Sequence, residues 1–319
     1  MRISNNMMVN QSLRDINANL NRMDKNQRDI STGKRIHRPS DDPTSLARAM
    51  VLRNGLAQND QFQKNAEVAQ SHLQITDTTL GQVGDALQRL RQLAVQGGSG
   101  NLREQDRVAI KNEVIQIRDE LRALGNTQIN GRYIFGGLKT DQVVYPQDNP
   151  ALPAGNGVSF SPNDQGSLSV EVAPNIVMNY NVAAPRVFGD TTPPGINHVF
   201  QVIDDFAGYL DGTLPPPPGV SGTGTSNRAI SEISLRDIST WLTNVNNVRT
   251  EVGAKLNRIE LTTVRMEEAN ITMNELLTNT EATDIAEASL KLNSYEATYR
   301  AALSVASRSI PLSLVDFLR

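Results

Sequence analysis

The chain contains no cysteine and only three histidines, one tryptophan, six tyrosines and seven phenylalanines among its 319 residues. Without thiols it cannot form disulfides, cysteine-ligated zinc or iron–sulfur centres, or a cysteine nucleophile. Aromatic side chains supply much of the core of a compact globule, so their scarcity favours an extended helical protein over an enzyme. At 38% hydrophobic and 20% charged residues, the sequence is nevertheless too apolar for a chain without a fixed fold.

Charge and hydropathy limit the partners. The formal net charge is −3, from 31 basic and 34 acidic residues. This balance argues against a nucleic-acid partner, because such binding depends on phosphate neutralisation by Lys and Arg. No apolar run approaches the length of a transmembrane helix, and the N-terminal segment has no apolar region typical of secretory signals. We therefore expect no membrane partner and no cleaved signal peptide.

Proline and glycine mark out a central insert. Twelve of the 15 prolines and ten of the 22 glycines lie between residues 141 and 225, with eight acidic residues and one basic residue. Apolar and polar residues alternate over 168–172 and 176–182, which predicts paired strands. A short amphipathic helix capped by Asn197 and a linker at 215–218 are expected to follow. The insert is predicted to be a small β-rich domain joined by two flexible crossings.

The segments on either side of the insert have apolar residues at alternating steps of three and four, which is typical of coiled-coil helices. Long series run over residues 62–94, 110–124 and 238–276, each a narrow stripe that must pack against a partner helix. The two chain ends carry stripes of their own, so the ends pair either with each other or with another molecule. The predicted assembly interface consists of Val9, Leu13, Ile16, Leu20, Met23, Ile30, Ile285, Leu292, Tyr299, Leu303, Ala306, Ile310 and Phe317.

Helix breaks complete the predicted architecture. Residues 39–43 stop the first helix, and Asp41 or Asp42 can cap the next one. The glycine-rich residues 97–101 separate two antiparallel helices, and residues 132–135 are typical of a short strand. The predicted fold is mainly α, an elongated helical bundle or coiled coil formed by both chain ends. Its expected domains are a terminal coiled-coil assembly domain (1–44 and 280–319), a long-helix rod domain (45–140 and 226–279) and the inserted outer domain (141–225).

Few groups are suited to catalysis. Lys34, Arg35 and Arg38 form a basic cluster, for which ion pairs with nearby Asp41 and Asp42 are a better interpretation than a ligand site. The three histidines lie in different segments, and the adjacent carboxylates at 204 and 205 are expected on a solvated helix face. We predict no catalytic, cofactor-binding or metal-binding residues and no enzymatic activity. The alternative from another class is a hydrolase or binding module in residues 141–225.

Three stretches carry a family resemblance. The first combines Ile3-Ser4 with Ser-Thr-Gly-Lys-Arg-Ile at 31–36 and Pro-Ser-Asp-Asp-Pro at 39–43. The second is Asn-Gly-Arg-Tyr-Ile-Phe-Gly-Gly at 130–137, and the third runs from Thr-Asp-Ile-Ala-Glu-Ala at 283–288 to Ser-Leu-Val-Asp-Phe-Leu at 313–318. With these stretches the chain resembles the flagellin-like proteins of the bacterial flagellum, most closely those at the hook–filament junction.

The resemblance implies a structural subunit of the extracellular flagellum, placed as a ring between hook-associated protein 1 and the flagellin filament. It also implies export of the unfolded chain by the flagellar type III apparatus, an export chaperone, and self-association through the terminal helices. A short filament flagellin is the alternative within the same class. Terminal stripes without a partner in the monomer further predict that residues 1–40 and 285–319 are mobile until assembly.

Overall fold

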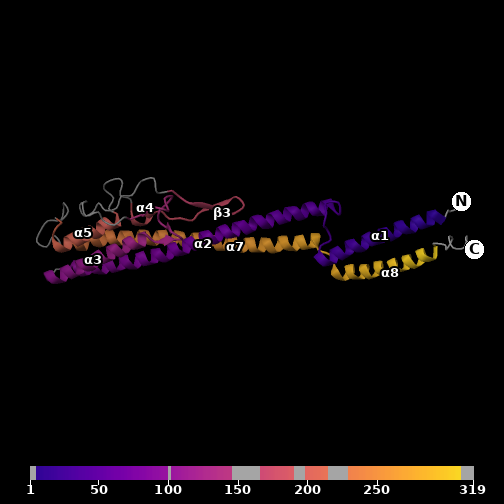
Figure 1. The fold of residues 1–319 in the computed structure, drawn as a ribbon. Coiled ribbons are helices and arrows are strands. Elements are labelled where there is room, and N and C mark those ends of the chain that lie inside the picture. Colours follow the sequence, from indigo (N-terminus) through magenta and orange to yellow (C-terminus); the bar gives the residue numbers. More distant parts are fainter. Residues whose placement is uncertain (1–4, 100–101, 146–165, 190–197, 215–228, 310–319) are drawn as a thin grey trace, which may run out of the picture. The chain divides into compact units, whose positions relative to one another are not determined.

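The computed structural model describes residues 5–99, 102–145, 166–189, 198–214 and 229–309. It is mainly helical, with small sheets only in the middle of the described chain (Figure 1), so the predicted fold class is confirmed. The chain forms two compact units, one of residues 1–59 and 267–319 and one of residues 60–266. The predicted linker at 215–218, Ile310, Phe317 and the side chain of Val9 lie outside the described residues.

The first unit is built from helices of both chain ends. It holds α1 (Asn5–Thr32), the beginning of α2 (Pro43–Gly97), the end of α7 (Leu235–Glu281) and α8 (Ile285–Ser309). All four segments are long enough for several turns, and most of the stability of such helices comes from packing of an apolar face. The stability of this unit therefore depends on its helix–helix contacts.

An aspartate begins the second helix. Asp42 Oδ1 accepts the Ser45 N–H at 3.0 Å, and Pro43 is the first helical residue, where a missing N–H costs nothing. Hydrogen bonds from Ser45 lower the pKa of Asp42. Asp41, the other candidate, instead accepts the Arg38 N–H at 3.0 Å, which lowers its pKa as well. Asp42 is thus the cap, and Asp41 shapes the preceding turn.

The second unit contains the main hydrophobic core. It combines the remainder of α2 with α3 (Glu104–Gly125) and with the first part of α7, which a π-helical turn (Ile230–Ser234) precedes. Most positions of the predicted series are confirmed as core positions, since the following residues are all buried: Ala66, Ala69, Leu73, Thr76, Leu80, Val83, Leu87, Leu90, Ala94, Ile110, Val114, Ile117, Leu121, Ile238, Val245, Val252, Ile259 and Met266. Leu276, at the end of the last series, is instead 50% exposed.

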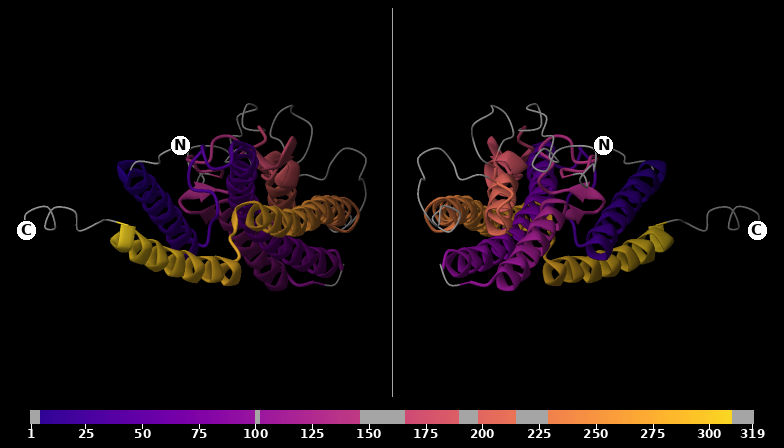
Figure 2. Two further views of the ribbon diagram at one scale, coloured as in Figure 1. Left: turned by 90° about the vertical axis from the view of Figure 1, so that its right-hand side faces the viewer. Right: turned by 90° about the vertical axis from the view of Figure 1, so that its left-hand side faces the viewer.

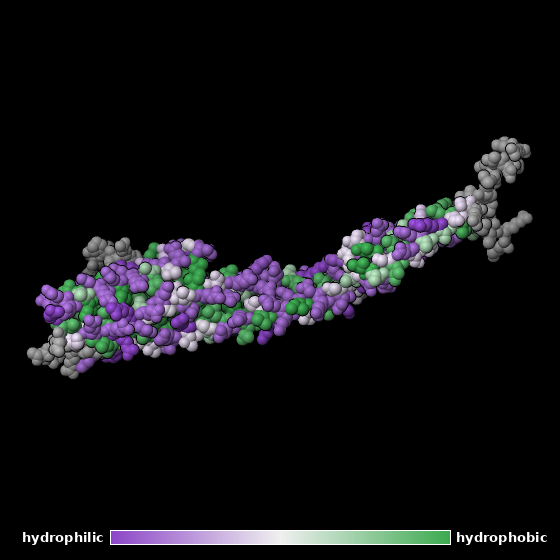
Figure 3. All heavy atoms as spheres, turned by 90° about the horizontal axis from the view of Figure 1, so that it is seen from below, coloured by the Kyte–Doolittle hydropathy of each residue, from purple (hydrophilic) through white to green (hydrophobic). Residues whose placement is uncertain are grey.

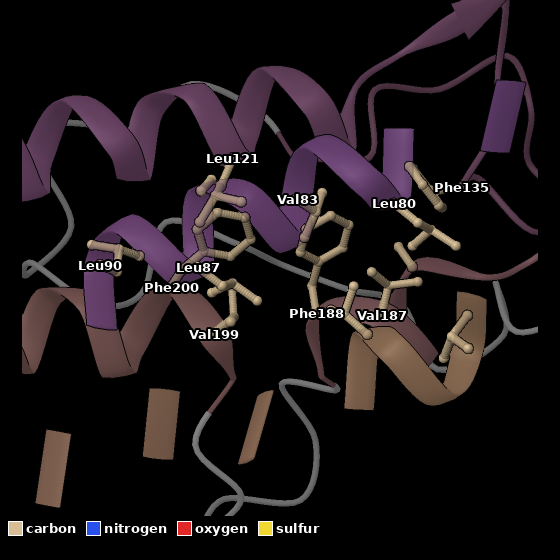
Figure 4. Packing of buried hydrophobic residues seen from close by; sticks show 14 of the residues in the cluster. Leu80, Val83, Leu87, Leu90, Leu121, Phe135, Val187, Phe188, Val199 and Phe200 are labelled. Carbon is tan, nitrogen blue, oxygen red and sulfur yellow. The ribbon is translucent and has the colours of Figure 1, made fainter. Parts of the chain in front are cut away.

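The insert contributes to this same core. Its strands β3 (Ser169–Ala173) and β4 (Ile176–Asn179) pair antiparallel as predicted, and two helices follow, α4 (Ala184–Phe188) and α5 (Val199–Asp211). Aromatic rings from these helices lie among the leucines of α2 and α3 (Figure 4), with the Phe188 and Phe200 centroids 5.8 Å apart. The described insert is therefore packed against the long helices, unlike the tethered domain that its proline content predicts.

A second, smaller hairpin lies before the insert. Strands β1 (Gln128–Ile129) and β2 (Arg132–Tyr133) pair antiparallel and are joined by Asn130 and Gly131, both with positive φ. An Asn-Gly pair suits such two-residue turns because both positions need the left-handed region. The short strand expected at 132–135 is thus confirmed in its first half.

The cap of α5 differs from the prediction. His198, and not Asn197, is the N-cap, and its Nδ1 accepts the Gln201 N–H at 3.1 Å; Asn197 lies outside the described residues. An accepting Nδ1 must be unprotonated, and burial lowers the pKa of His198 accordingly. The single histidine of the insert therefore has a structural role.

An ion pair ties α4 to α7 and predicts a pH dependence. Arg186 Nη2 lies 2.7 Å from Glu251 Oε2, and this bond, assisted by Lys255, lowers the pKa of Glu251 from 4.5 to about 2. A lowered carboxyl pKa gives stability that is present above the unfolded pKa and lost as the pH falls from 4.5 towards 2.

We therefore expect Glu251→Gln to lower the free energy of unfolding at pH 7 by on the order of 1 kcal/mol, because partial exposure screens the pair. Urea unfolding at pH 7 and pH 2.5 would measure it. The difference between the variant and the parent should shrink at the lower pH, and an equal difference at both pH values would contradict the assignment.

Candidate assembly interface

The two terminal helices pack against each other (Figure 2). Asn19 Nδ2 in α1 donates to the Tyr295 main-chain oxygen in α8 at 3.0 Å, and Asn26 Nδ2 donates to the Ala288 main-chain oxygen at 2.6 Å. The bonds advance by seven residues along α1 and go back by seven along α8, so the helices are antiparallel. Of the alternatives that the sequence leaves open, the structure shows the two ends of one chain paired with each other.

The α1 side of this seam uses half of the predicted stripe. Ile16 is buried, and Met23 and Ile30 are half-buried at seven-residue steps from it. The positions between them on the seam are Asn19 and Asn26, which are only 5% and 7% exposed. The seam thus differs from the stripe that periodicity predicts, because asparagine takes the companion positions.

The α8 side has the same offset. Leu292, Tyr299 and Ala306 of the predicted stripe are half-buried, as expected for seam positions. Ala288, which is buried, and Tyr295, which is half-buried, take the companion positions. On both helices the companion residue is therefore one position earlier in the chain than the apolar pattern predicts.

The displaced leucines form an outer row, which we define as Leu13, Leu20 and Leu303. Leu13 is 51% and Leu303 43% exposed, and Leu20 is half-buried. Consecutive residues are turned by about 100° around a helix axis. In an antiparallel pair, the residues that follow the companion positions of the two helices therefore lie on the same side of the seam. The register of the two asparagine bonds puts Leu13 level with residues 301–303. The pair therefore presents one apolar row beside its seam.

Further apolar residues of the first unit are exposed. Ile285, which the sequence places in the interface, is 56% exposed at the start of α8. Met7, Leu290 and Val305 are also more than half exposed on the same two helices. Apolar residues gather visibly on the described part of this helix pair (Figure 3). Exposed apolar side chains of this kind can be buried against a partner.

Two backbone hydrogen bonds anchor the pair at its base. The Arg35 N–H donates to the Glu281 main-chain oxygen at 2.7 Å, and the Thr283 N–H donates to the Gly33 oxygen at 3.0 Å, around an isolated β-bridge at Lys34. Gly33 has φ +68°, a conformation that L side chains rarely adopt. The chain segment after α1 is thereby fixed to the segment before α8.

A buried carboxylate completes this anchor. Glu281 Oε2 lies 2.6 Å from Arg53 Nη2 and 3.3 Å from Lys34 Nζ, and the Glu281 side chain is 5% exposed. Arg35 Nη2 lies 3.8 Å from Asp42 Oδ2, which confirms the ion-pair interpretation for this member of the basic cluster. Lys34 pairs with Glu281 instead, and Asp41 pairs with Lys25. The role of Glu281 has no sequence signal, because its partners are more than 220 residues away in the chain.

The two adjacent carboxylates at 204 and 205 lie against neighbouring helices. Arg118 Nη1 lies 2.8 Å from Asp204 Oδ1, so the expected solvated face at 204–205 is instead held against α3. Asp205 is half-buried, and burial followed by the Asp204 charge raises its pKa. Within the described ranges, no three His, Asp or Glu residues are grouped to hold a metal ion. In the same ranges, no helix is both long and apolar enough for a membrane crossing.

Both helical regions match a known family. Residues 3–140 match the bacterial flagellin N-terminal helical region, and residues 235–318 match the bacterial flagellin C-terminal helical region. The chain belongs to the bacterial flagellin family. This flagellin-family protein is a structural component of the bacterial flagellum, and its α1–α8 pair, anchor and outer row all lie in the matched regions.

Individual relatives refine this assignment. The flagellin-family chain is 28% identical to flagellar hook-associated protein 3 of Escherichia coli (strain K12) over 270 residues, 82% of this chain and 81% of that protein. It is 30% identical to a flagellin of Clostridium tyrobutyricum over 59% of this chain and 50% of that protein. Its fold matches the crystal structure of flagellar hook-associated protein 3 from Legionella pneumophila, with a TM-score of 0.62 and 16% identity over 72% of this chain and 98% of that one.

Proposed function

We propose that the chain is the structural subunit of the hook–filament junction. The observation that carries this placement is the match to hook-associated protein 3, at 28% identity over four-fifths of both chains. The subunits form a ring between hook-associated protein 1 on the hook side and flagellin on the filament side. The role is structural and does not require catalysis.

Assembly takes place through the terminal helices. Within one chain the α1–α8 seam buries Ile16 and Ala288 but leaves Leu13 and Leu303 about half exposed. Burying such side chains against a neighbouring subunit contributes ~1–2 kcal/mol each. This gain supports the assembly role of Leu13 and Leu303, and the other predicted interface residues are proposed to act with them. Residues 1–44 and 280–319 act as the assembly domain, 45–140 and 226–279 as the wall, and 141–225 as the outer surface.

Export of the chain to the growing flagellum is the second part of the proposal. The chain passes unfolded through the flagellar type III apparatus without a cleaved signal and refolds at the tip. The absence of cysteine supports this step, since no disulfide has to form or break. A cytoplasmic export chaperone covers the apolar surface of the C-terminal helix before export, which prevents early assembly.

Deleting the gene and imaging the flagella tests the junction role. Electron microscopy should show complete hooks that carry no filament, and flagellin should accumulate in the medium. Expression of the intact chain from a plasmid should restore the filaments. Normal filaments in the deletion strain would contradict the proposal.

A short filament flagellin is the second candidate, which the identity to the Clostridium flagellin favours. The two candidates differ in self-assembly. A filament flagellin polymerises alone into long filaments, whereas a junction subunit adds only a thin zone at the hook tip. Electron microscopy of concentrated purified protein, seeded with filament fragments, separates the two roles.

A further inference from the structure

The asparagines of the α1–α8 seam have a regular arrangement. Asn19 and Asn26 are seven residues apart, both are more than nine-tenths buried, and both amides donate to main-chain oxygens of α8. Their acceptors, at Tyr295 and Ala288, are also seven residues apart. The same contact is therefore made twice, one heptad apart, and neither bond depends on the identity of an α8 side chain.

Apolar burial alone favours a different face of α1. A rotation of α1 by about 50°, half the turn of one residue, would keep Ile16 and the residues at seven-residue steps from it in the seam. Leu13 and Leu20 would then take the companion positions of Ser12 and Asn19. Leu13 would then lose its 51% exposure, and the outer row would be covered within a single chain. The observed rotation keeps the amides on α8 and the leucines outside.

We infer that Asn19 and Asn26 are positioning residues that select which face of α1 meets α8. An asparagine side chain is short, so Nδ2 reaches an α8 main-chain oxygen only when the residue faces the seam. Buried polar residues at coiled-coil core positions specify one arrangement among several that apolar residues would allow. The two amides thereby prevent α1 from burying Leu13 and Leu20 against α8 of the same chain. The outer row stays available to a second copy of the chain. This last consequence rests on the proposed function.

Cysteine reporters test the face selection in the purified protein, because the chain has no cysteine of its own. Leu13→Cys reports on the outer row and Ser12→Cys on the companion row, each made singly. Maleimide reaction rates are measured in trimethylamine N-oxide, which favours the paired state. Each reporter is then combined with the double substitution Asn19→Ala, Asn26→Ala. Alanine is chosen because α8 already has an alanine at a companion position, Ala288.

The expected result is a change of opposite sign at the two reporters. If both faces become equally populated, the rate at Leu13→Cys falls to about half and the rate at Ser12→Cys rises about twofold. The matched control, Asn17→Ala with Asn21→Ala, replaces exposed residues of the same helix and should change neither rate. Two rates that rise together, as for a merely weakened pair, or two unchanged rates would overturn the inference.

Filament counts separate this inference from the proposed function. The Asn19→Ala, Asn26→Ala chain should support fewer filaments per cell than the control chain, at equal amounts of secreted protein. If the reporter rates shift in opposite directions while filament number stays unchanged, the face selection stands and the assembly role of the outer row is refuted.

Discussion

Aspartate at two positions of the outer row, Leu13→Asp with Leu303→Asp, is expected to leave cells with hooks but without filaments. Both side chains are about half exposed in the single chain, so the substitutions change the stability of the purified protein by only about 0.5 kcal/mol. In the ring that we propose, the same positions become buried against a neighbour, where an unpaired carboxylate costs several kcal/mol. Swimming assays and electron microscopy measure the loss.

A matched control separates charge from position. Asn17→Asp with Asn293→Asp adds the same two charges to the same helices at exposed polar positions. We expect this control chain to restore swimming in the deletion strain. If the outer-row variant also restores swimming, the assembly role of Leu13 and Leu303 is wrong.

Leu87→Ala should have the largest effect on stability. Leu87 is fully buried in the second unit, near Leu121 and Phe200 (Figure 4). Removing a buried leucine side chain costs the lost apolar contacts and leaves a cavity, together about 3 kcal/mol. Urea unfolding followed by circular dichroism measures it. Leu261→Ala, at a position that is 70% exposed, is the control and should stay within about 0.5 kcal/mol.

The two sets of variants should have opposite phenotypes. Leu87→Ala weakens the second unit but does not alter the outer row, so we expect filaments to form at the growth temperature. The outer-row variant keeps the second unit intact and loses filaments. A Leu87→Ala chain that retains full stability would show that the core is not packed as the structure describes.

The core of the second unit could be predicted from the sequence because one period governs it. Residues 66–94 of α2, 110–121 of α3 and 238–266 of α7 repeat apolar side chains at the spacing of a helix face, and the structure buries those positions. The β3–β4 hairpin could also be predicted, since strand alternation is a local signal. Of the β1–β2 hairpin, only the second strand is expected from the sequence.

The α1–α8 seam could not be predicted in detail because its determinants are distant in the chain. Two rows of α1 flank the heptad position of Ile16, one with Leu13 and Leu20 and one with Asn19 and Asn26. Hydropathy alone favours the leucine row as the buried one. Selecting the asparagines requires knowing that an α8 carbonyl oxygen lies 2.6 Å from Asn26 Nδ2. Buried Glu281 is a similar case, since its two cationic partners come from the other end of the sequence.

The packing of the insert escaped prediction for another reason. Proline and glycine density indicates flexible connections, but it does not show whether the apolar residues between them find an external core. Nine of the twelve residues of α5 from Val199 to Leu210 are buried, which requires the long helices as partners. His198 likewise acts as a cap through its ring nitrogen, a role for which Asn is the more usual residue.

Amide hydrogen exchange tests the central claim most directly, that the terminal helices complete their packing only in the assembled ring. In the confirmed monomer, the amides of α1 and α8 should exchange with an opening free energy below about 2 kcal/mol, because their seam buries few apolar side chains. The core amides of α2 and α3 should be far more protected. On assembly, α1 and α8 should become as slow as that core. Strong protection of α1 and α8 already in the monomer, unchanged by assembly, would contradict the claim.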